Sequence, residues 1–417
     1  MEGKRSKKDA PLTGRGGPMA VTVALVVLLA TVGRAGASLT VVSETGSPKN
    51  RVNVVFLGDG YTADQIDTAY TQHIDSVLAH VFDAGEEPFG RYRNFFNIYR
   101  LDVVSAESGA DVPPLGIYRD TALDGSYYYG GGPERLLYVN QAKANAALSA
   151  ALSGSDITAD VRWVVVNDTR YGGGGGGYAV FAGGNSYAGE LALHETGHSF
   201  SDLADEYVDP SYGSAVYSGP EPYAANVTAD PTGSKWSQWL GYVDSLGTVG
   251  TYEGAKYYQY GLYRPTPTSK MKALDQPFNA VSREKIVQDI YAQVHPLDAY
   301  LKVRGVLVDP AEVWVDVVDP NVIQIDWYVD EVLVTGAAGE TFRLEDYGYG
   351  PGHYGVYADV YDPTEWVRLG RDDMEQFASW TIELTPEPAG VLLMMAGGGI
   401  VLLRRRRSSP AASATRT

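Results

Sequence analysis

Cysteine is absent from this chain of 417 residues, and histidine occurs only six times. Without cysteine no disulfide can staple the fold, so stability must come from the size of the core or from bound ions. Basic side chains are also scarce, because 33 Lys and Arg face 51 Asp and Glu and give a formal net charge of −18. Residues 1–37 contribute +4 and residues 389–417 contribute +5, so the part between them carries −27. Such acidity argues against nucleic acid and anionic membrane surfaces as partners.

Long hydrophobic runs are missing as well, and two short ones lie near the ends of the chain. MAVTVALVVLLATV follows a basic stretch and precedes Ala35-Gly36-Ala37. This order predicts a secretory signal over residues 1–37 and a mature chain that begins at Ser38. Near the other end, Ala389 to Leu403 precedes the four arginines Arg404 to Arg407, as in a short stop-transfer anchor. We therefore expect an exported protein.

Residues 38–297 have the pattern of a mixed α/β (α+β) domain. Val52 to Leu57 is strand-like, a glycine-containing turn follows it, and Thr62 with Gln65 forms a capping box for a helix. A further strand-like run, Val161 to Asn167, comes after the helical pattern RLLYVNQAKANAALSAAL. Strands that alternate with helices predict this fold class.

The rest of the chain divides by composition. Six consecutive glycines, Gly172 to Gly177, cannot sit inside a regular element, and we interpret them as a flexible linker or a substrate-side flap. Residues 298–384 consist of short runs rich in β-branched and aromatic side chains, which predict an all-β sandwich of immunoglobulin-like type. Residues 385–407 form the apolar segment with its arginines, and residues 408–417 form a tail.

The stretch LALHETGHSFSDLADEY carries the strongest chemical signal. His194 and His198 lie one turn apart on the same face of a predicted helix, so both imidazoles can bind one metal ion. Glu195 lies about 100° round the helix axis, where its carboxylate can reach a metal-bound water and act as a base. This HExxH pattern predicts two ligands and a general base of a zinc peptidase.

A catalytic zinc ion needs a third protein ligand and an open position. The metzincin spacing would place that ligand at Ala204, which cannot serve. Asp202 would lie about 12 Å along the axis from His194 if the helix continued, which is too far. If the helix breaks after Ser201, Asp205 can turn back toward the metal, and we predict it as the third ligand, with Glu206 as the alternative.

Several ordered blocks resemble one known family. HETGHSFSDLADEY is similar to the signature of the IgA-peptidase family of bacterial zinc metallopeptidases, peptidase family M-sixty-four. The resemblance extends over about residues 51–290 and includes VVFLGDGYTADQ, EPFGRYRNFFNIYRLDVVSAESGAD, VVVNDTRYGGGGGG and YQYGLYRPTPTSKMKALDQPFNAVSREKI. It implies a metzincin-like fold, one Zn²⁺ and endopeptidase activity on a protein or peptide substrate. It also implies that Met271 forms the methionine floor beneath the zinc ligands.

Two departures from the family pattern bear on the site. Asn279 and Ser282 stand where members often carry cysteine, so a local disulfide is absent. Ser201 and Asp202 replace the glycines that are common after HSF, which leaves the path of the turn toward Asp205 open.

An oxyanion donor is harder to choose. In the fragment KYYQYGLYRP, Tyr260, Tyr263 or Arg264 could donate a hydrogen bond to the tetrahedral oxyanion, and we predict Tyr263 as the second catalytic residue. The remaining histidines have no partner pattern, and we expect them to be structural or exposed: His73, His80, His295 and His353.

The C-terminal segment also resembles a known pattern. Pro386-Glu387-Pro388, the apolar run and the arginines are similar to the PEP-CTERM sorting tail. This resemblance implies an exosortase-type sorting machinery as a partner, transient membrane anchoring, and delivery to the cell surface or extracellular matrix.

The predicted function is peptide-bond hydrolysis, in which Glu195 takes a proton from water at the zinc ion and returns it to the leaving amine. The strand Val161 to Asn167 is expected to align the substrate by edge pairing. One alternative is a non-catalytic adhesive or scaffolding protein of the extracellular matrix, although such a protein has no need of Glu195. Another keeps the zinc ion but cleaves a peptidoglycan or glycopeptide linkage.

Overall fold

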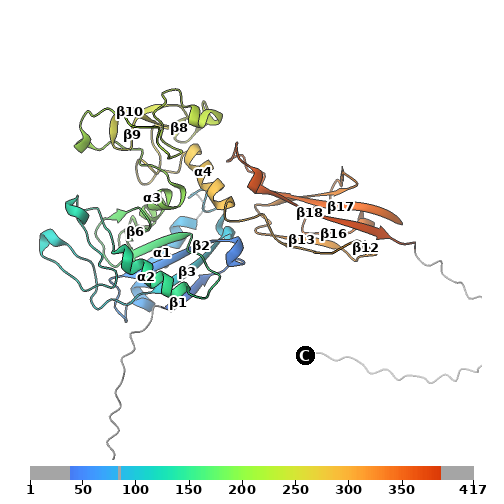
Figure 1. Cartoon of the computed structure of the whole chain (residues 1–417), viewed down its shortest axis with the longest axis horizontal. Helices are drawn as coiled ribbons and strands as arrows, with labels where there is room; N and C mark the ends of the chain where they lie inside the picture. The colour runs from blue at the N-terminus through green and yellow to red at the C-terminus, as the bar shows by residue number, and fades with distance from the viewer. Residues whose placement is uncertain (1–37, 83–85, 387–417) are drawn as a thin grey trace, which may run out of the picture. The chain divides into compact units, whose positions relative to one another are not determined.

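The computed structural model describes residues 38–82 and 86–386 (Figure 1). The predicted signal segment, and the predicted sorting segment and tail from residue 387 onward, lie outside the described residues. Within the described ranges, every helix is too short or too polar to cross a bilayer. The described chain is mixed α/β with several sheets, in agreement with the predicted fold class.

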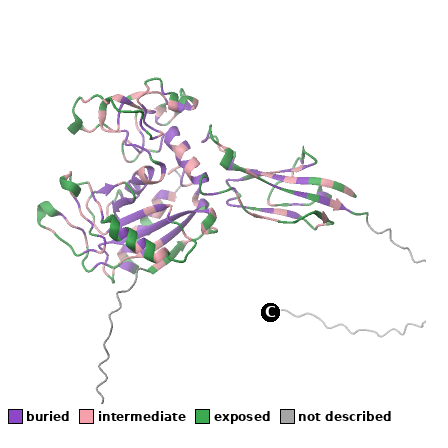
Figure 2. Ribbon diagram, viewed as in Figure 1, coloured by how far each residue is buried: buried purple, intermediate pink, exposed green. Residues whose placement is uncertain are grey.

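A six-stranded sheet forms the framework of the first part, with strand order β1-β3-β2-β4-β6-β5. Its four inner strands run parallel, and the two edge strands run antiparallel to their neighbours. All eight residues of β2 are buried, as expected for a parallel strand covered on both faces (Figure 2). The strands are β1 (Ser38–Ser43), β2 (Val52–Asp59), β3 (Phe96–Asp102), β4 (Val161–Val166), β5 (Gly173–Gly174) and β6 (Ala179–Ala182).

Helices cover both faces of this sheet. Val54 and Phe56 of β2 point into one core, while Val55 and Leu57 point into another, because successive side chains of a strand alternate. The first core is closed by α1 (Thr71–Phe82), α3 (Ala188–Ser201) and α4 (Ala280–Tyr291). The second is closed by α2 (Gln141–Leu152) through Ala144 and Leu148.

The predicted strand, turn and helix after residue 51 are present, but the helix begins differently from the prediction. The side chain of Gln65 accepts a hydrogen bond from the Thr62 backbone N–H at 3.1 Å, which is one half of the expected capping box. A π-helical turn, Ile66–Tyr70, then leads into α1.

Two sequence predictions about this sheet are wrong. β4 lies between β2 and β6, so the strand of residues 161–167 has no free edge along which a substrate could pair. The glycine run is also not wholly a flexible loop, because Gly173 and Gly174 form β5 at the edge of the sheet. The outer side of β5 is itself occupied at Gly173, whose N–H donates to Arg135 O and whose carbonyl accepts from the Leu137 N–H.

Between α3 and α4 the chain forms two small two-stranded sheets, which Figure 1 shows in yellow-green. The same segment also contains a small hydrophobic core, which includes Ala204, Val227 and Leu262. The strands are β7 (Val243–Asp244), β8 (Gly247–Thr248), β9 (Tyr252–Ala255) and β10 (Tyr258–Arg264).

From residue 297 onward the described chain is built of strands in two sheets, ordered β11-β13-β16 and β12-β18-β17-β14-β15. Trp327 of the five-stranded sheet stacks on Phe342 of the three-stranded sheet, with ring centroids 5.0 Å apart, so the two sheets share one core. The strands are β11 (Leu297–Tyr300), β12 (Val306–Val308), β13 (Val313–Val317), β14 (Gln324–Val329), β15 (Val332–Leu333), β16 (Thr341–Phe342), β17 (Gly352–Tyr361) and β18 (Glu375–Leu384).

Candidate metal centre and cleft

Helix α3 carries the HExxH motif and ends where the chain must turn. Asp202 adopts a left-handed conformation with φ of 51°, and the Leu203 N–H donates to Gly197 O at 2.9 Å. A left-handed residue at this position is a usual way to end a helix. The break after Ser201 that would allow Asp205 to turn back is therefore present.

The three predicted ligands lie together. His194 Nε2 and His198 Nε2 are 3.2 Å apart, and Asp205 Oδ1 lies 3.2 Å from the first and 3.4 Å from the second. Ligand bonds of about 2.0–2.1 Å in a tetrahedral zinc site place neighbouring ligand atoms about 3.3 Å apart. Asp205 Oδ1 is buried and has no hydrogen-bond partner among the described residues. A divalent metal ion fits this donor set and would satisfy that oxygen.

The backbone orients both imidazoles. Lys270 O lies 2.9 Å from Nδ1 of His194, and Leu203 O lies 2.6 Å from Nδ1 of His198. A carbonyl only accepts hydrogen bonds, so each Nδ1 carries a proton and each Nε2 is left to bind a metal ion. Burial acts to lower the pKa of His198, but the negative charge of Asp205 beside it outweighs burial and raises this pKa to about 9.

Asp205 is held in place by hydrogen bonds on both sides of its segment. Its carbonyl accepts from the Lys256 N–H, and its Oδ2 accepts from the Tyr257 hydroxyl at 2.5 Å. On the other side, the Glu206 N–H donates to Met271 O at 2.7 Å. The hairpin of β9 and β10 thus fixes the third donor.

Glu206, the alternative third ligand, points elsewhere. Its Oε1 accepts hydrogen bonds from Asn226 and Asn279, each at 2.9 Å, and its Oε2 accepts from Ser269 at 2.7 Å. It is completely buried, and burial raises its pKa. Glu206 therefore joins three segments of the chain and lies outside the group formed by His194, His198 and Asp205.

Glu195 lies in the wall of the cleft beneath the glycine segment. A Cβ atom at Gly173 would come within 3.3 Å of Glu195 Oε1, and one at Gly175 within 2.7 Å of Oε2. Only glycine allows the backbone to approach the carboxylate so closely. Burial raises the pKa of Glu195, which suits a residue that must accept and return a proton.

Met271 is completely buried against α3. A Cβ atom at Gly197, the residue before His198, would lie 2.7 Å from Met271 Sδ. This methionine therefore packs directly against the backbone of the helix that carries both histidines.

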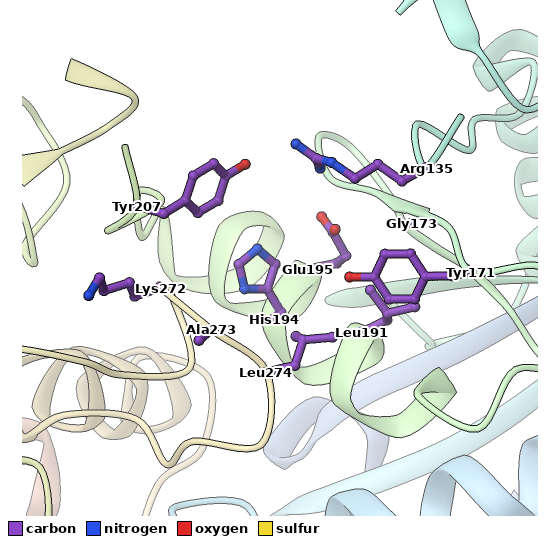
Figure 3. A pocket seen from close by; sticks show the side chains of 10 residues that line it. All are labelled: Arg135, Tyr171, Gly173, Leu191, His194, Glu195, Tyr207, Lys272, Ala273 and Leu274. Carbon is purple, nitrogen blue, oxygen red and sulfur yellow. The ribbon is translucent and has the colours of Figure 1, made fainter. Parts of the chain in front are cut away.

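Two adjoining pockets open around Glu195, and together they form one cleft. Figure 3 shows the first of them. The first has a volume of about 280 Å³ and the second about 240 Å³. Five residues line both pockets: Arg135, Gly173, His194, Glu195 and Tyr207. Tyr171 and Lys272 line only the first, while His198, Asp205 and Tyr257 line only the second.

The predicted oxyanion donor is not among the residues that line the cleft. Tyr263 lies on β10, where it pairs with Glu253 and exchanges backbone hydrogen bonds with Thr228. Tyr207 and Tyr257 line the cleft instead, and sequence reasoning missed both. Tyr207 had a usable signal, because it follows Asp205 and Glu206 directly in LADEY.

A second group of polar residues holds the segment whose backbone orients His194. Glu190, one turn before His194 on α3, accepts hydrogen bonds from Lys270 Nζ at 2.9 and 3.0 Å and from the Asp275 N–H at 2.7 Å. His80 Nε2 also lies 2.9 Å from Glu190 Oε1. Because Lys270 O orients His194, this ion pair helps to position a proposed ligand.

The site combines two histidines on one helix, a third acidic donor and a buried carboxylate in an open cleft. This arrangement is typical of metal-dependent hydrolases. The family model described as IgA Peptidase M64 matches residues 40–249 and 243–290, which is more than half of the chain. The chain belongs to this family, and membership makes it a peptidase. No protein with curated annotation matches it.

Proposed function

We propose that this chain is a zinc-dependent endopeptidase whose zinc ligands are His194, His198 and Asp205 and whose general base is Glu195. The observation that carries the proposal is the triangle of donor atoms with sides of 3.2, 3.2 and 3.4 Å. It lies in an open cleft whose walls include a buried carboxylate. A metzincin-like peptidase fold and an immunoglobulin-like second part are included in the proposal.

The residues of the site have separate roles in the proposed reaction. When bound, a zinc ion would acidify water and polarise the scissile carbonyl group. Glu195 takes a proton from the attacking water, and its elevated pKa allows it to return that proton to the leaving amine. Tyr207 presents its hydroxyl group at the cleft and is better placed than Tyr263 to stabilise an oxyanion, whereas the Tyr257 hydroxyl already donates to Asp205 Oδ2.

We also propose that the protein is exported and delivered to the cell surface or extracellular matrix, after transient anchoring and processing by an exosortase-type machinery. The support is the sequence of residues 1–37 and 385–407. Mass spectrometry of the mature protein isolated from its own cells tests this. A first residue other than Ser38 would contradict the proposed signal cleavage.

Metal analysis and proteolysis together test the proposed chemistry. Purified full chain should contain about one zinc ion per molecule and degrade casein or gelatin, and a chelator should abolish this activity. Glu195→Ala should keep the zinc ion and lose activity by a factor of about 10²–10⁴. Glu312→Ala, which removes an exposed carboxylate far along the sequence from the motif, is the matched control. Full activity of Glu195→Ala would reject the proposed base.

A further inference from the structure

The cleft contains cations that the proposed hydrolysis does not use. Arg135 lines both pockets, and Lys272 lines the larger one. Figure 3 shows the Arg135 guanidinium and the Lys272 side chain on different sides of the opening above Glu195 and His194. The only acidic residue of this larger pocket is Glu195, in a chain with a net charge of −18. A positively charged pocket in such an acidic protein needs a reason.

Neither cation is neutralised by a carboxylate. Among the described residues, no Asp or Glu oxygen lies within 4.0 Å of the Arg135 or Lys272 side-chain nitrogens. Lys272 Nζ donates only to the backbone carbonyl of Pro267, at 2.8 Å. By contrast, Lys270, two residues earlier, is paired with both Glu86 and Glu190. The two cations of the cleft are therefore available to an anionic ligand.

Arg135 is also fixed in position by its backbone. Its carbonyl accepts a hydrogen bond from the Gly173 N–H at 3.0 Å, and the Leu137 N–H donates to Gly173 O at 3.3 Å. Gly173 belongs to the segment that closes over Glu195. The backbone that carries the Arg135 side chain is thus paired with the strand that packs on the proposed base, so its distance from Glu195 depends on a backbone pairing and not on a free loop.

These observations bear on which substrates fit. Because the edge of β5 at Gly173 is already paired with residues 135–137, that edge cannot bind the backbone of a substrate there. At this point of the cleft, recognition is therefore left to side chains such as those of Arg135 and Lys272. Guanidinium and ammonium groups bind carboxylates with charge-assisted hydrogen bonds, and an arginine can do so with two parallel bonds.

We propose that the pocket between Arg135 and Lys272 binds a carboxylate of the substrate beside the scissile bond, so that the enzyme prefers acidic peptides. The carboxylate comes either from an Asp or Glu side chain or from the C-terminus of the substrate, and the second source would make the enzyme a carboxypeptidase instead of an endopeptidase. This inference rests on the proposed peptidase function and specifies its substrate class. Arg135 and Lys272 are specificity-determining residues in this proposal.

Four matched peptides distinguish the sources of the carboxylate. They carry either Glu or Gln next to one cleavable bond, and each has either a free C-terminus or a C-terminal amide. Zinc-loaded full chain should cleave the preferred carboxylate form with a kcat/KM about 10- to 100-fold higher than its neutral counterpart. A preference for Glu over Gln assigns the side chain, and a preference for the free acid over the amide assigns the terminus.

The variants test whether the cleft cations cause the preference. Arg135→Gln and Lys272→Gln should each reduce the ratio of kcat/KM for the charged and neutral peptides, and together they should bring it close to one. Arg119→Gln is the matched control, because it removes an exposed arginine that lines neither pocket. Its ratio should equal that of the wild type.

Binding separates this inference from the peptidase function itself. Zinc-loaded Glu195→Ala should bind the carboxylate peptide about 10-fold more tightly than the neutral one in a fluorescence-anisotropy titration, whether or not the wild type hydrolyses it. Equal affinities, or a preference that survives in Arg135→Gln and Lys272→Gln, would overturn the carboxylate site. Selective binding without hydrolysis by the wild type would instead overturn the proposed enzyme and leave the site standing.

Discussion

At the scale of single residues, Asp205 and Glu206 are adjacent acids with opposite surroundings. Side chains that follow one another in an extended segment point to opposite sides. Asp205 faces the two histidines, whereas Glu206 faces three neutral hydrogen-bond donors in the interior. Both carboxylates are buried, so only their partners decide which one can bind a metal ion.

This contrast predicts separable effects of two conservative substitutions. Asp205→Asn should lower zinc affinity at least about 100-fold, because it removes a direct ligand. Glu206→Gln should keep zinc, since the new amide can still accept from Asn226 and Asn279 and can donate to the Ser269 hydroxyl. Zinc titration with a competing chelator measures both affinities, and loss of zinc in Glu206→Gln alone would assign the ligand to Glu206.

The glycines over Glu195 give a second prediction at this scale. Gly175→Ala would place a methyl group 2.7 Å from Glu195 Oε2 and 3.3 Å from His198 Cβ, so the carboxylate must move. We expect kcat to fall by about 10- to 100-fold, because a displacement of about 1 Å in a catalytic group has this effect. The melting temperature should change little, since Oε2 ends a flexible side chain.

Gly177→Ala is the matched control for Gly175→Ala. The nearest atom to its new Cβ would be Gln141 Oε1 at 3.7 Å, an ordinary contact. If the two variants have the same kcat, the glycine segment does not position Glu195.

Local geometry explains which parts of the site could be predicted from the sequence. His194, Glu195 and His198 share one helix, whose regular spacing determines how they face one another. The approach of Asp205 required only that the helix end after Ser201. Arg135, Tyr207 and Tyr257 reach the cleft from different segments, and no spacing rule connects them to the motif.

At the scale of elements, the glycine segment shows why strands without side chains escape prediction. Strands are recognised from alternating side chains, and a run of glycines has none. Gly173 and Gly174 form β5 because β6 pairs with them on one side and residues 135–137 on the other. These tertiary contacts, absent from the local sequence, also explain why residues 161–167 are not at an edge.

Three adjacent strands of the five-stranded sheet place acidic residues together. Asp326 of β14 lies directly opposite Asp359 of β17, and like charges in such a pair destabilise a sheet. Burial, followed by the charges of Glu375 and Asp326, raises the pKa of Asp359 from 3.8 to about 6. The folded state therefore holds a proton that the unfolded state releases between pH 4 and 6.

This shift predicts a pH-dependent effect of Asp359→Asn. With its raised folded-state pKa, Asp359 makes the wild type lose stability as pH rises from about 4 to 6. The variant should be more stable than the wild type at pH 7.5, by less than about 1 kcal/mol because the site is partly exposed. The advantage should vanish near pH 4. Calorimetry at both pH values measures it, and a difference independent of pH would contradict the shift.

At the scale of the whole molecule, one buried carboxylate links the α/β part to the β part. Asp362, just after β17, accepts hydrogen bonds from Tyr92 at 2.5 Å, Tyr291 at 2.9 Å and Arg91 at 2.8 Å. Asp362 is completely buried, and Tyr291 belongs to α4. Three donors from the peptidase part thus converge on one acceptor of the β part.

Removing this acceptor should uncouple the two parts. Asp362→Ala would leave two buried hydroxyl groups and a guanidinium without their acceptor, at a cost of about 3–5 kcal/mol. We expect the wild type to unfold in one calorimetric transition and the variant in two, because the cost falls on the contact between the parts. Asp372→Ala, an exposed acid in the same β part, is the control and should keep a single transition. A single transition in Asp362→Ala with an unchanged midpoint would show that this carboxylate does not couple the two parts.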